Sequence, residues 1–138
     1  HLIPNILKVA LEKKEIFEIF GNNYNTHDGT CIRDYVHVYD ICLAHWLANK
    51  YMNVSKIRET YNIGSNSGYS ILQVLDKVKK ITGIDIPYKV VRKKNGDSHS
   101  LVADSNKIRD QFNWKPKYSD LGIIIKHGWE WEKKAKIN

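Results

Sequence analysis

The chain has 138 residues, of which 42% are hydrophobic and 27% charged, as is typical of one small soluble domain or of part of a longer protein. No apolar run approaches the roughly 20 residues that a membrane span requires, and no basic leader opens the chain, so we expect neither a membrane protein nor a secreted one. Lysine and arginine number 22 against 15 aspartate and glutamate residues, and the formal charge of +7 fits either a solvated lysine-rich surface or an anionic partner.

The first part of the sequence predicts two helices with a strand and a polar loop between them. Apolar residues at helical spacing indicate a helix over 2–14, and imperfect alternation indicates a strand over 16–20. Residues 35–38 resemble a short extended segment. Asp40 is a suitable N-cap for a helix that runs to about Met52, and two adjoining apolar stripes predict that this helix is largely buried.

The middle of the sequence predicts a helix between two strands. Residues 60–64 are expected to form a strand that ends in a turn. Ser70 then caps a helix with one apolar face, and Gly83 ends this helix. A second strand is predicted over 87–91.

Two further helices are predicted near the C-terminus. Asp104 is expected to cap a short helix that ends at Phe112, and Asp120 to begin a final helix whose apolar residues include Trp131. The pattern predicts a mixed α and β chain without repeats. It forms a single region over 1–138, with no internal domain boundary.

Familiar catalytic and cofactor-binding motifs are absent from the sequence. It has no glycine-rich dinucleotide fingerprint, no P-loop and no nucleophile with an adjacent base. Cys31 and Cys42 form no C-x-x-C pair, and the histidines lack ligand spacing, so we expect no metal site and a reducing, cytoplasmic location. His37, within the expected extended segment, fits a core histidine better than a catalyst.

Residues suited to bind a nucleotide-like anion lie in two places. The planar guanidinium of Arg33 can fork onto phosphate oxygens, unless it pairs with Asp34 or with a helix C-terminus. A turn over 92–97 holds three cations and ends in Asp97, whose carboxylate can accept two hydrogen bonds from a ribose diol, unless the turn is only a solvated surface feature. Phe20 can offer a ring face to a base, unless it belongs to the core.

Three stretches of the sequence closely resemble the C-terminal part of the UDP-glucose/UDP-galactose 4-epimerases, a family of extended short-chain dehydrogenases/reductases. The first runs over 20–40 and contains Arg-Asp-Tyr followed by His-Val. The second begins with the Tyr-Asn-Ile-Gly sequence at 61–64, and the third runs over 96–116 and contains Gly-Asp, Ala-Asp and Asn-Trp-Lys-Pro. The resemblance covers nearly the whole chain, and its first stretch is the most specific.

The resemblance implies that residues of the N-terminal segments contact the diphosphate and the base. Leu2 would present its backbone to the diphosphate, and its neighbour His1 stands where the family usually has asparagine. Phe20 would lie beside the uracil, and Glu18 would offer backbone groups to the edge of that base.

The resemblance assigns the remaining binding roles to residues further along. Arg33 would bind the diphosphate, with Tyr35 nearby, and Lys94 occupies the position of a second phosphate-binding arginine. Asp97 would hold the uridine ribose. Leu101 falls at a pocket-wall position that is bulky in enzymes restricted to hexoses and small in those that also accept N-acetylhexosamines.

Catalysis in the resembled family depends on an N-terminal Rossmann-type domain that holds NAD and a Tyr-x-x-x-Lys pair. NAD takes hydride from C4 of the hexose and returns it to the other face of a 4-keto intermediate. No tyrosine of this chain is followed by lysine four residues later. The resemblance therefore implies the C-terminal substrate-binding portion of an extended Rossmann-type reductase, with the dinucleotide-binding domain missing. We expect no catalytic, cofactor-binding or metal-binding residue here and no activity of this portion alone.

The principal hypothesis is a cytoplasmic, homodimeric isomerase that interconverts UDP-glucose and UDP-galactose, with this chain supplying the UDP-binding half of the pocket. The first alternative is another reductase-family enzyme acting on a nucleotide sugar, either a dehydratase or a decarboxylase. The second is a basic nucleic-acid-binding module. It is disfavoured because no recognised nucleic-acid motif is present and the aromatic residues fall mostly on expected core faces.

Overall fold

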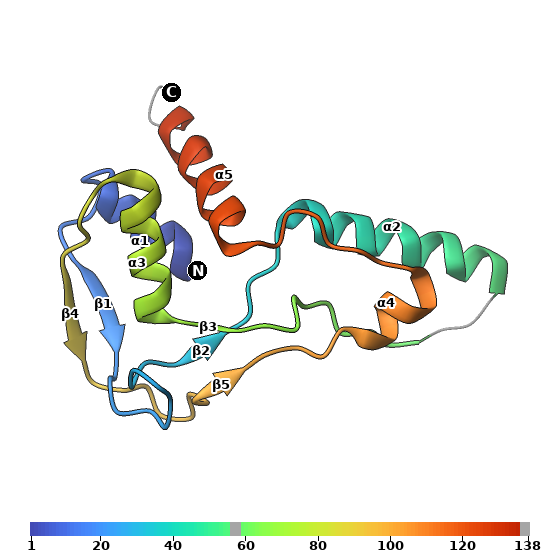
Figure 1. The fold of residues 1–138 in the computed structure, drawn as a ribbon, viewed down its shortest axis with the longest axis horizontal. Coiled ribbons are helices and arrows are strands. Elements are labelled where there is room, and N and C mark those ends of the chain that lie inside the picture. The colour runs from blue at the N-terminus through green and yellow to red at the C-terminus, as the bar shows by residue number, and fades with distance from the viewer. Residues whose placement is uncertain (56–58, 136–138) are drawn as a thin grey trace.

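The computed structural model describes residues 1–55 and 59–135, in which helices lie beside two small sheets (Figure 1). The helices are α1 (Leu2–Ala10), α2 (Val38–Ser55), α3 (Ile71–Thr82), α4 (Asn106–Phe112) and α5 (Leu121–Lys134). The strands are β1 (Phe17–Phe20), β2 (Ile32–Arg33), β3 (Tyr69–Ser70), β4 (Tyr88–Val91) and β5 (Ser100–Leu101). Strand β1 pairs in parallel with β4, while β2 lies antiparallel to β3 and parallel to β5. The predicted mixed α/β class is confirmed.

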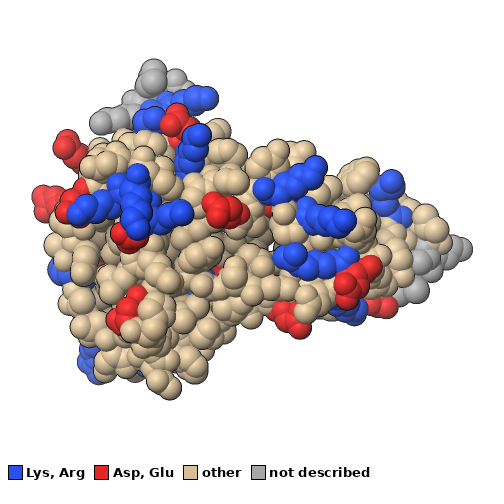
Figure 2. All heavy atoms as spheres, viewed as in Figure 1, with Lys and Arg blue, Asp and Glu red and all other residues tan. Residues whose placement is uncertain are grey.

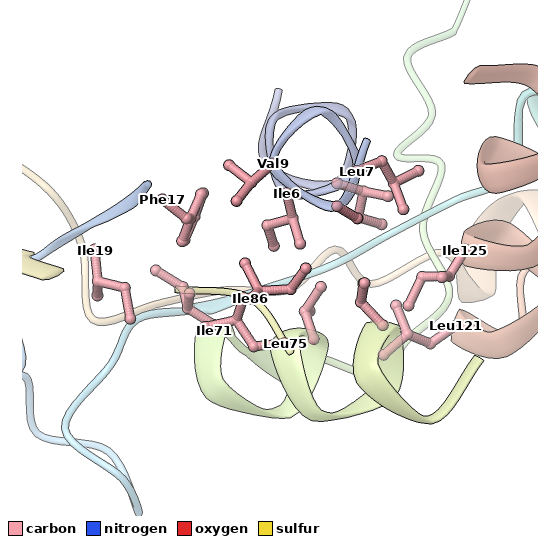
Figure 3. Close-up of a cluster of buried hydrophobic side chains, with 14 of the residues drawn as sticks. Ile6, Leu7, Val9, Phe17, Ile19, Ile71, Leu75, Ile86, Leu121 and Ile125 are labelled. Atoms are coloured by element: carbon pink, nitrogen blue, oxygen red, sulfur yellow. The ribbon is translucent and has the colours of Figure 1, made fainter. Parts of the chain in front are cut away.

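Two hydrophobic cores lie at opposite ends of the structure, with the β3–β2–β5 sheet between them (Figure 1). In the larger core, side chains of α1 face those of α3 and α5, as Figure 3 shows for Leu7, Leu75 and Ile125. In the smaller core, Ala44 of α2 packs with Ile108 of α4 and with the indole of Trp114. The small central sheet therefore connects two separately packed groups of helices.

The most local of the predicted elements, α3, is confirmed at both ends. Ser70 Oγ accepts from the Gln73 backbone N–H at 3.2 Å, and Gln73 Oε1 accepts from the Ser70 N–H at 2.9 Å, which together form a capping box. Gly83 ends the helix with φ at 74°, a left-handed conformation that glycine adopts without steric cost. The final helix also begins as predicted, because Asp120 accepts from the N–H of Ile123.

The boundaries of α1 and α4 differ from the prediction. Helix α1 ends at Ala10 rather than at residue 14, and Glu12 then adopts a left-handed φ of 58° that interrupts helical geometry. Helix α4 has Ser105 at its N-cap position rather than Asp104. The carboxylate of Asp104 instead accepts from the N–H of Asn106 at 2.9 Å, inside the first turn.

The extended segment predicted over 35–38 and the strand predicted over 60–64 are both wrong. Strand β2 ends at Arg33, two residues before the predicted segment begins, and α2 already begins at Val38. In the second segment, side chains bind the backbone groups that a sheet would use. The Gly64 carbonyl accepts from Ser105 Oγ at 2.8 Å, and the next N–H, of Ser65, donates to Asp34 at 3.1 Å.

Asp40 does not cap α2, which corrects the prediction from the sequence. Its side chain accepts from the N–H groups of Lys117 at 2.9 Å and Tyr118 at 2.8 Å, both in the loop before α5. His37 takes the capping position instead, since its Nδ1 accepts from the Tyr39 N–H at 3.0 Å. The aspartate thereby fastens α2 to the loop that leads into α5.

Helix α2 is more exposed than its apolar stripes predict. Ala44 and Asp40 are buried, but Trp46 and Val54 are 55% and 86% exposed. Trp131, one of the apolar residues predicted for the final helix, is 72% exposed on α5. None of the described helices is long and apolar enough to cross a membrane.

The basic residues are distributed over a surface of mixed charge. On the face seen in Figure 2, lysine and arginine lie among aspartate and glutamate over α3 and over the end formed by α2 and α4. Several are in exposed ion pairs, such as Lys79 with Asp85 and Lys107 with Glu59, each at 2.8 Å. Such exposed pairs contribute little to stability. On this face, the positive charge therefore fits a solvated surface better than a continuous basic stripe.

Candidate functional site

Most of the predicted binding residues line one cavity of about 660 Å³. They are His1, Leu2, Phe20, Arg33, Tyr35 and Asp97. Their positions follow from the sheet pairings, because the parallel register places Phe20 of β1 opposite Val91 of β4. The turn that follows β4 therefore begins beside Phe20. Side chains from α1, β1, β2 and this turn thus meet at one site.

Arg33 is anchored at the cavity by the backbone and by a carboxylate. Its Nη1 donates to the carbonyl oxygens of Ile32 at 2.8 Å and Ser98 at 3.0 Å, and its Nη2 lies 3.6 Å from Asp97 Oδ1. Arg33 therefore pairs with Asp97, not with Asp34 as one alternative from the sequence had it. A partly buried guanidinium held in this way presents its remaining donors in a fixed direction.

The start of α1 adds backbone donors to the cavity wall. Residues 1–4 line the cavity, and the side chain of His1, at the N-cap position, makes no capping hydrogen bond. The first N–H groups of a helix have no partner within the helix and carry partial positive charge. This wall therefore favours an anionic group.

Two predicted residues lie near the cavity without lining it. The Lys94 ammonium lies 4.0 Å from the centroid of the Phe20 ring, which is a cation–π contact. The Glu18 carboxylate lies 3.0 Å from Lys89 on the neighbouring strand, and that hydrogen bond lowers the pKa of Glu18. The binding roles expected of Lys94 and of the Glu18 backbone stay predictions.

Leu101 lies directly opposite Arg33 in the parallel β2–β5 pairing. Its side chain is 57% exposed and lines a second cavity, of about 460 Å³, together with Arg33 and Asp34. Arg33 lines both cavities. A ligand bound to this guanidinium can therefore reach Leu101, whose role as a pocket wall stays a prediction.

Two buried titratable side chains of the cavity wall, Tyr35 and Cys31, are unsuited to acid–base catalysis near neutral pH. Burial raises the pKa of Tyr35 to about 12 and raises that of the Cys31 thiol, so both groups stay protonated. Among residues 1–55 and 59–135, no group of three or more histidine, cysteine, aspartate or glutamate side chains could hold a metal ion. The arrangement is suited to binding an anion rather than to transferring a proton.

Two aspartates of the 20–40 stretch have structural roles that the sequence did not reveal. Asp28 accepts from the Thr30 N–H at 2.9 Å and also from Ser70 Oγ, which ties the loop to the cap of α3. Asp34 accepts from the Ser65 N–H at 3.1 Å and the Ala103 N–H at 3.3 Å. Most of these partners lie tens of residues away in the sequence, so no local signal identifies them.

Known proteins with similar sequences and structures cover almost the whole chain. A UDP-glucose 4-epimerase from Lactobacillus helveticus is 48% identical over 133 residues, which are 96% of this chain and 40% of that protein. The crystal structure of a UDP-glucose 4-epimerase from Stenotrophomonas maltophila, with bound NAD and formylated UDP-arabinopyranose, superimposes with a TM-score of 0.95 at 31% identity, covering 99% of this chain and 40% of that one. A UDP-Glc/GlcNAc 4-epimerase from Campylobacter jejuni superimposes at 0.83 with 39% identity, covering 96% of this chain and 40% of that one.

The chain spans about 40% of the length of these relatives. The model of the family described as GDP-mannose 4,6 dehydratase matches residues 1–124, which is most of the chain. The chain therefore belongs to the GDP-mannose 4,6 dehydratase family.

Proposed function

We propose that this chain forms the nucleotide-binding part of an NAD-dependent enzyme that interconverts UDP-glucose and UDP-galactose. One observation carries the proposal: the fold gathers Phe20, Arg33 and Asp97, which lie far apart in the sequence, around one cavity at the start of α1. The likeness to the L. helveticus UDP-glucose 4-epimerase over 96% of the chain supports the choice of substrate.

The proposed binding mode follows from the charges and shapes of the cavity wall. Arg33 and the N–H groups at the start of α1 supply positive potential for the diphosphate. The Asp97 carboxylate accepts hydrogen bonds from the ribose hydroxyls, while its contact with Arg33 holds both side chains in place. The Phe20 ring lies beside the base. The ammonium of Lys94 then makes a cation–π contact with the Phe20 ring, at 4.0 Å from its centroid, on the face that does not meet the base.

NAD does not fit the residues of this chain. The sequence has no glycine-rich fingerprint and no Tyr-x-x-x-Lys pair, so we assign cofactor binding and hydride transfer to other parts of the full polypeptide. The residues described above bind and orient the nucleotide. Homodimer formation, a cytoplasmic location and the absence of nucleic-acid binding stay predictions.

Residues 1–138 by themselves are expected to show no epimerase activity and no tight binding of NAD. The reason is that the groups that would hold the cofactor and move the proton are absent from this sequence. The measurement is conversion of UDP-galactose to UDP-glucose in the presence of added NAD, with the full polypeptide assayed in parallel. Turnover by residues 1–138 above the enzyme-free background would overturn this assignment.

Leu101→Ser in the full polypeptide is expected to raise kcat/KM for UDP-N-acetylglucosamine relative to UDP-glucose, by about tenfold. A smaller side chain leaves room for the acetamido group, and one apolar pocket residue discriminates by about 1–3 kcal/mol. We expect the unmodified protein to prefer the unsubstituted hexoses. The control is Val90→Ser, an exposed valine of β4 outside both cavities. An unchanged ratio would show that Leu101 is not the specificity residue.

A nucleotide-sugar dehydratase is the second candidate, because the matching family model is described by that activity. The two functions differ in their products. An epimerase converts UDP-galactose to UDP-glucose with no loss of water, whereas a 4,6-dehydratase releases water and leaves a 4-keto-6-deoxy sugar. Incubating the full polypeptide with UDP-galactose, separating the products by chromatography and determining their masses therefore distinguishes the two: an epimerase gives UDP-glucose of unchanged mass, and a dehydratase gives a product lighter by one water.

A further inference from the structure

His37 and His127 form a chain of hydrogen bonds that runs from the N-terminus of α2 to α5. The Tyr39 N–H donates to His37 Nδ1 at 3.0 Å, and His37 Nε2 lies 3.0 Å from His127 Nδ1. A backbone N–H only donates, so His37 Nδ1 must be the acceptor, and the neutral ring carries its proton on Nε2. His37 Nε2 is therefore the donor to His127 Nδ1.

This chain of hydrogen bonds requires both imidazoles to be neutral. Protonation of His37 would place a proton on Nδ1 opposite the Tyr39 N–H, and protonation of His127 would place one opposite His37 Nε2–H. The geometry also disfavours a cation between the rings, because the proton on His37 Nε2 occupies the position that a metal would need. The pair is thus suited to sense protons.

The groups around the pair come from each segment packed against it. From α2, the Asp40 carboxylate faces His37 but already accepts from the loop before α5. From that loop, the Tyr118 ring lies 5.6 Å from His37 and 6.1 Å from His127. Burial, and then the neighbouring His127, lower the pKa of His37, while Asp40 has the opposite effect.

The pair joins two segments that both line the nucleotide cavity. Val36, next to His37, and Gly128, next to His127, both line the 660 Å³ cavity. A Cβ at Gly128 would lie 3.1 Å from Leu7 Cδ1, so α5 packs closely against α1 on its other side. The imidazole pair is therefore a polar link between α5 and the segment that carries Tyr35 and Val36, beside the hydrogen bond from the His37 N–H to Ser119 Oγ at 3.1 Å in the loop before α5.

We propose that His37 is a positioning residue that acts through His127 as a proton-sensitive latch on the α5 wall of the cavity. When His127 Nδ1 gains a proton, the link between the rings loses its acceptor and breaks. When His37 Nδ1 gains one, the Tyr39 N–H is displaced and the His37 ring is released from the N-terminus of α2. Either event weakens the attachment of α5 to residues 35–37. The latch itself is inferred from the hydrogen bonds of the two histidines, whereas its effect on a nucleotide ligand rests on the proposed function.

The pH range follows from the direction of the pKa shift. A histidine whose pKa is lowered by folding favours the folded arrangement while it is neutral. Its contribution is complete above the ordinary pKa of 6.5 and is lost as the pH falls through the lowered value. The latch is therefore closed at neutral pH and opens in mild acid.

Hydrogen exchange of the ligand-free full polypeptide tests the latch. After correction for intrinsic exchange rates, protection of residues 124–131 is expected to fall about fivefold between about pH 7.5 and 5.5. In His127→Leu, which changes an exposed residue, protection should be low at both pH values. His127→Asn should restore protection at the higher pH, because its Oδ1 can replace Nδ1 as the acceptor. The control is His45→Asn, an exposed histidine of α2 bonded to the Ile41 carbonyl oxygen at 2.8 Å.

Two outcomes would overturn the latch: protection that does not change with pH in the unmodified protein, or unaltered pH dependence in His127→Leu. A second measurement, by calorimetry, uses UDP-glucose, whose diphosphate diester does not titrate in this range. Its affinity is expected to fall about fivefold over the same range in the unmodified protein and to be lower and pH-independent in His127→Leu. Absence of UDP-glucose binding at every pH would contradict the proposed function, while the exchange results would still decide the latch.

Discussion

Replacing Asp40 by alanine is expected to lower the free energy of unfolding of the full polypeptide by about 3–5 kcal/mol. The carboxylate is fully buried and accepts from the N–H groups of Lys117 and Tyr118 and from Ser119 Oγ, at 2.7–2.9 Å. Hydrogen bonds to a charged acceptor are stronger than neutral ones, and alanine would leave these donors without a partner. Urea denaturation measures the change.

Asp120→Ala is the matched control for Asp40→Ala. Asp120 begins α5 and accepts one hydrogen bond, from the N–H of Ile123 at 3.1 Å, so its loss should cost about 1 kcal/mol. If Asp40→Ala lowered the free energy of unfolding no more than Asp120→Ala does, the conclusion that Asp40 fastens α2 to the loop before α5 would be wrong.

The contribution of Asp40 should also depend on pH. Burial opposes the charged form, but hydrogen bonds from Lys117, Ser119 and Tyr118 outweigh it and lower the pKa of Asp40 below its ordinary 3.8. A carboxylate whose pKa is lowered by folding stabilises the protein above its ordinary pKa, and this stabilisation is lost as the pH falls through the lowered value. The stability difference between the unmodified protein and Asp40→Ala should therefore shrink below about pH 4.

Arg33→Lys in the full polypeptide is expected to weaken the binding of UDP-glucose by about 1.5–3 kcal/mol. Lysine keeps the charge but loses the planar fork, and it cannot reproduce together the bonds to Ile32, Ser98 and Asp97. Titration calorimetry measures the affinity directly.

The matched control makes the same substitution at another arginine, Arg92, in the turn that follows β4. Arg92 is exposed, follows β4 directly and does not line the nucleotide cavity, so Arg92→Lys should leave the affinity unchanged. If Arg33→Lys also left the affinity for UDP-glucose unchanged, Arg33 would serve only to hold the Asp97 carboxylate and the Ser98 carbonyl in place.

The sequence by itself was sufficient for elements whose determinants lie within a few residues. The capping box at Ser70, the left-handed Gly83 and the cap at Asp120 act locally, and the structure confirms all three. The resemblance also identified residues that the fold gathers at one cavity, such as Phe20 and Arg33. Their meeting depends on the parallel pairing of β1 with β4 and of β2 with β5, which the sequence did not reveal.

Only the tertiary structure decided how the polar residues of the 20–40 stretch are used. Locally, Asp40 is a suitable helix cap, but its partners lie 77–79 residues further along the chain, and His37 caps α2 in its place. Arg33 likewise pairs with Asp97 rather than with its neighbour Asp34. A buried charge takes whichever partners satisfy it most completely, and packing brings those partners together from distant parts of the sequence. Short-range patterns therefore predicted where α3 and α5 begin, whereas the start of α2 and the contacts that shape the cavity depended on the fold.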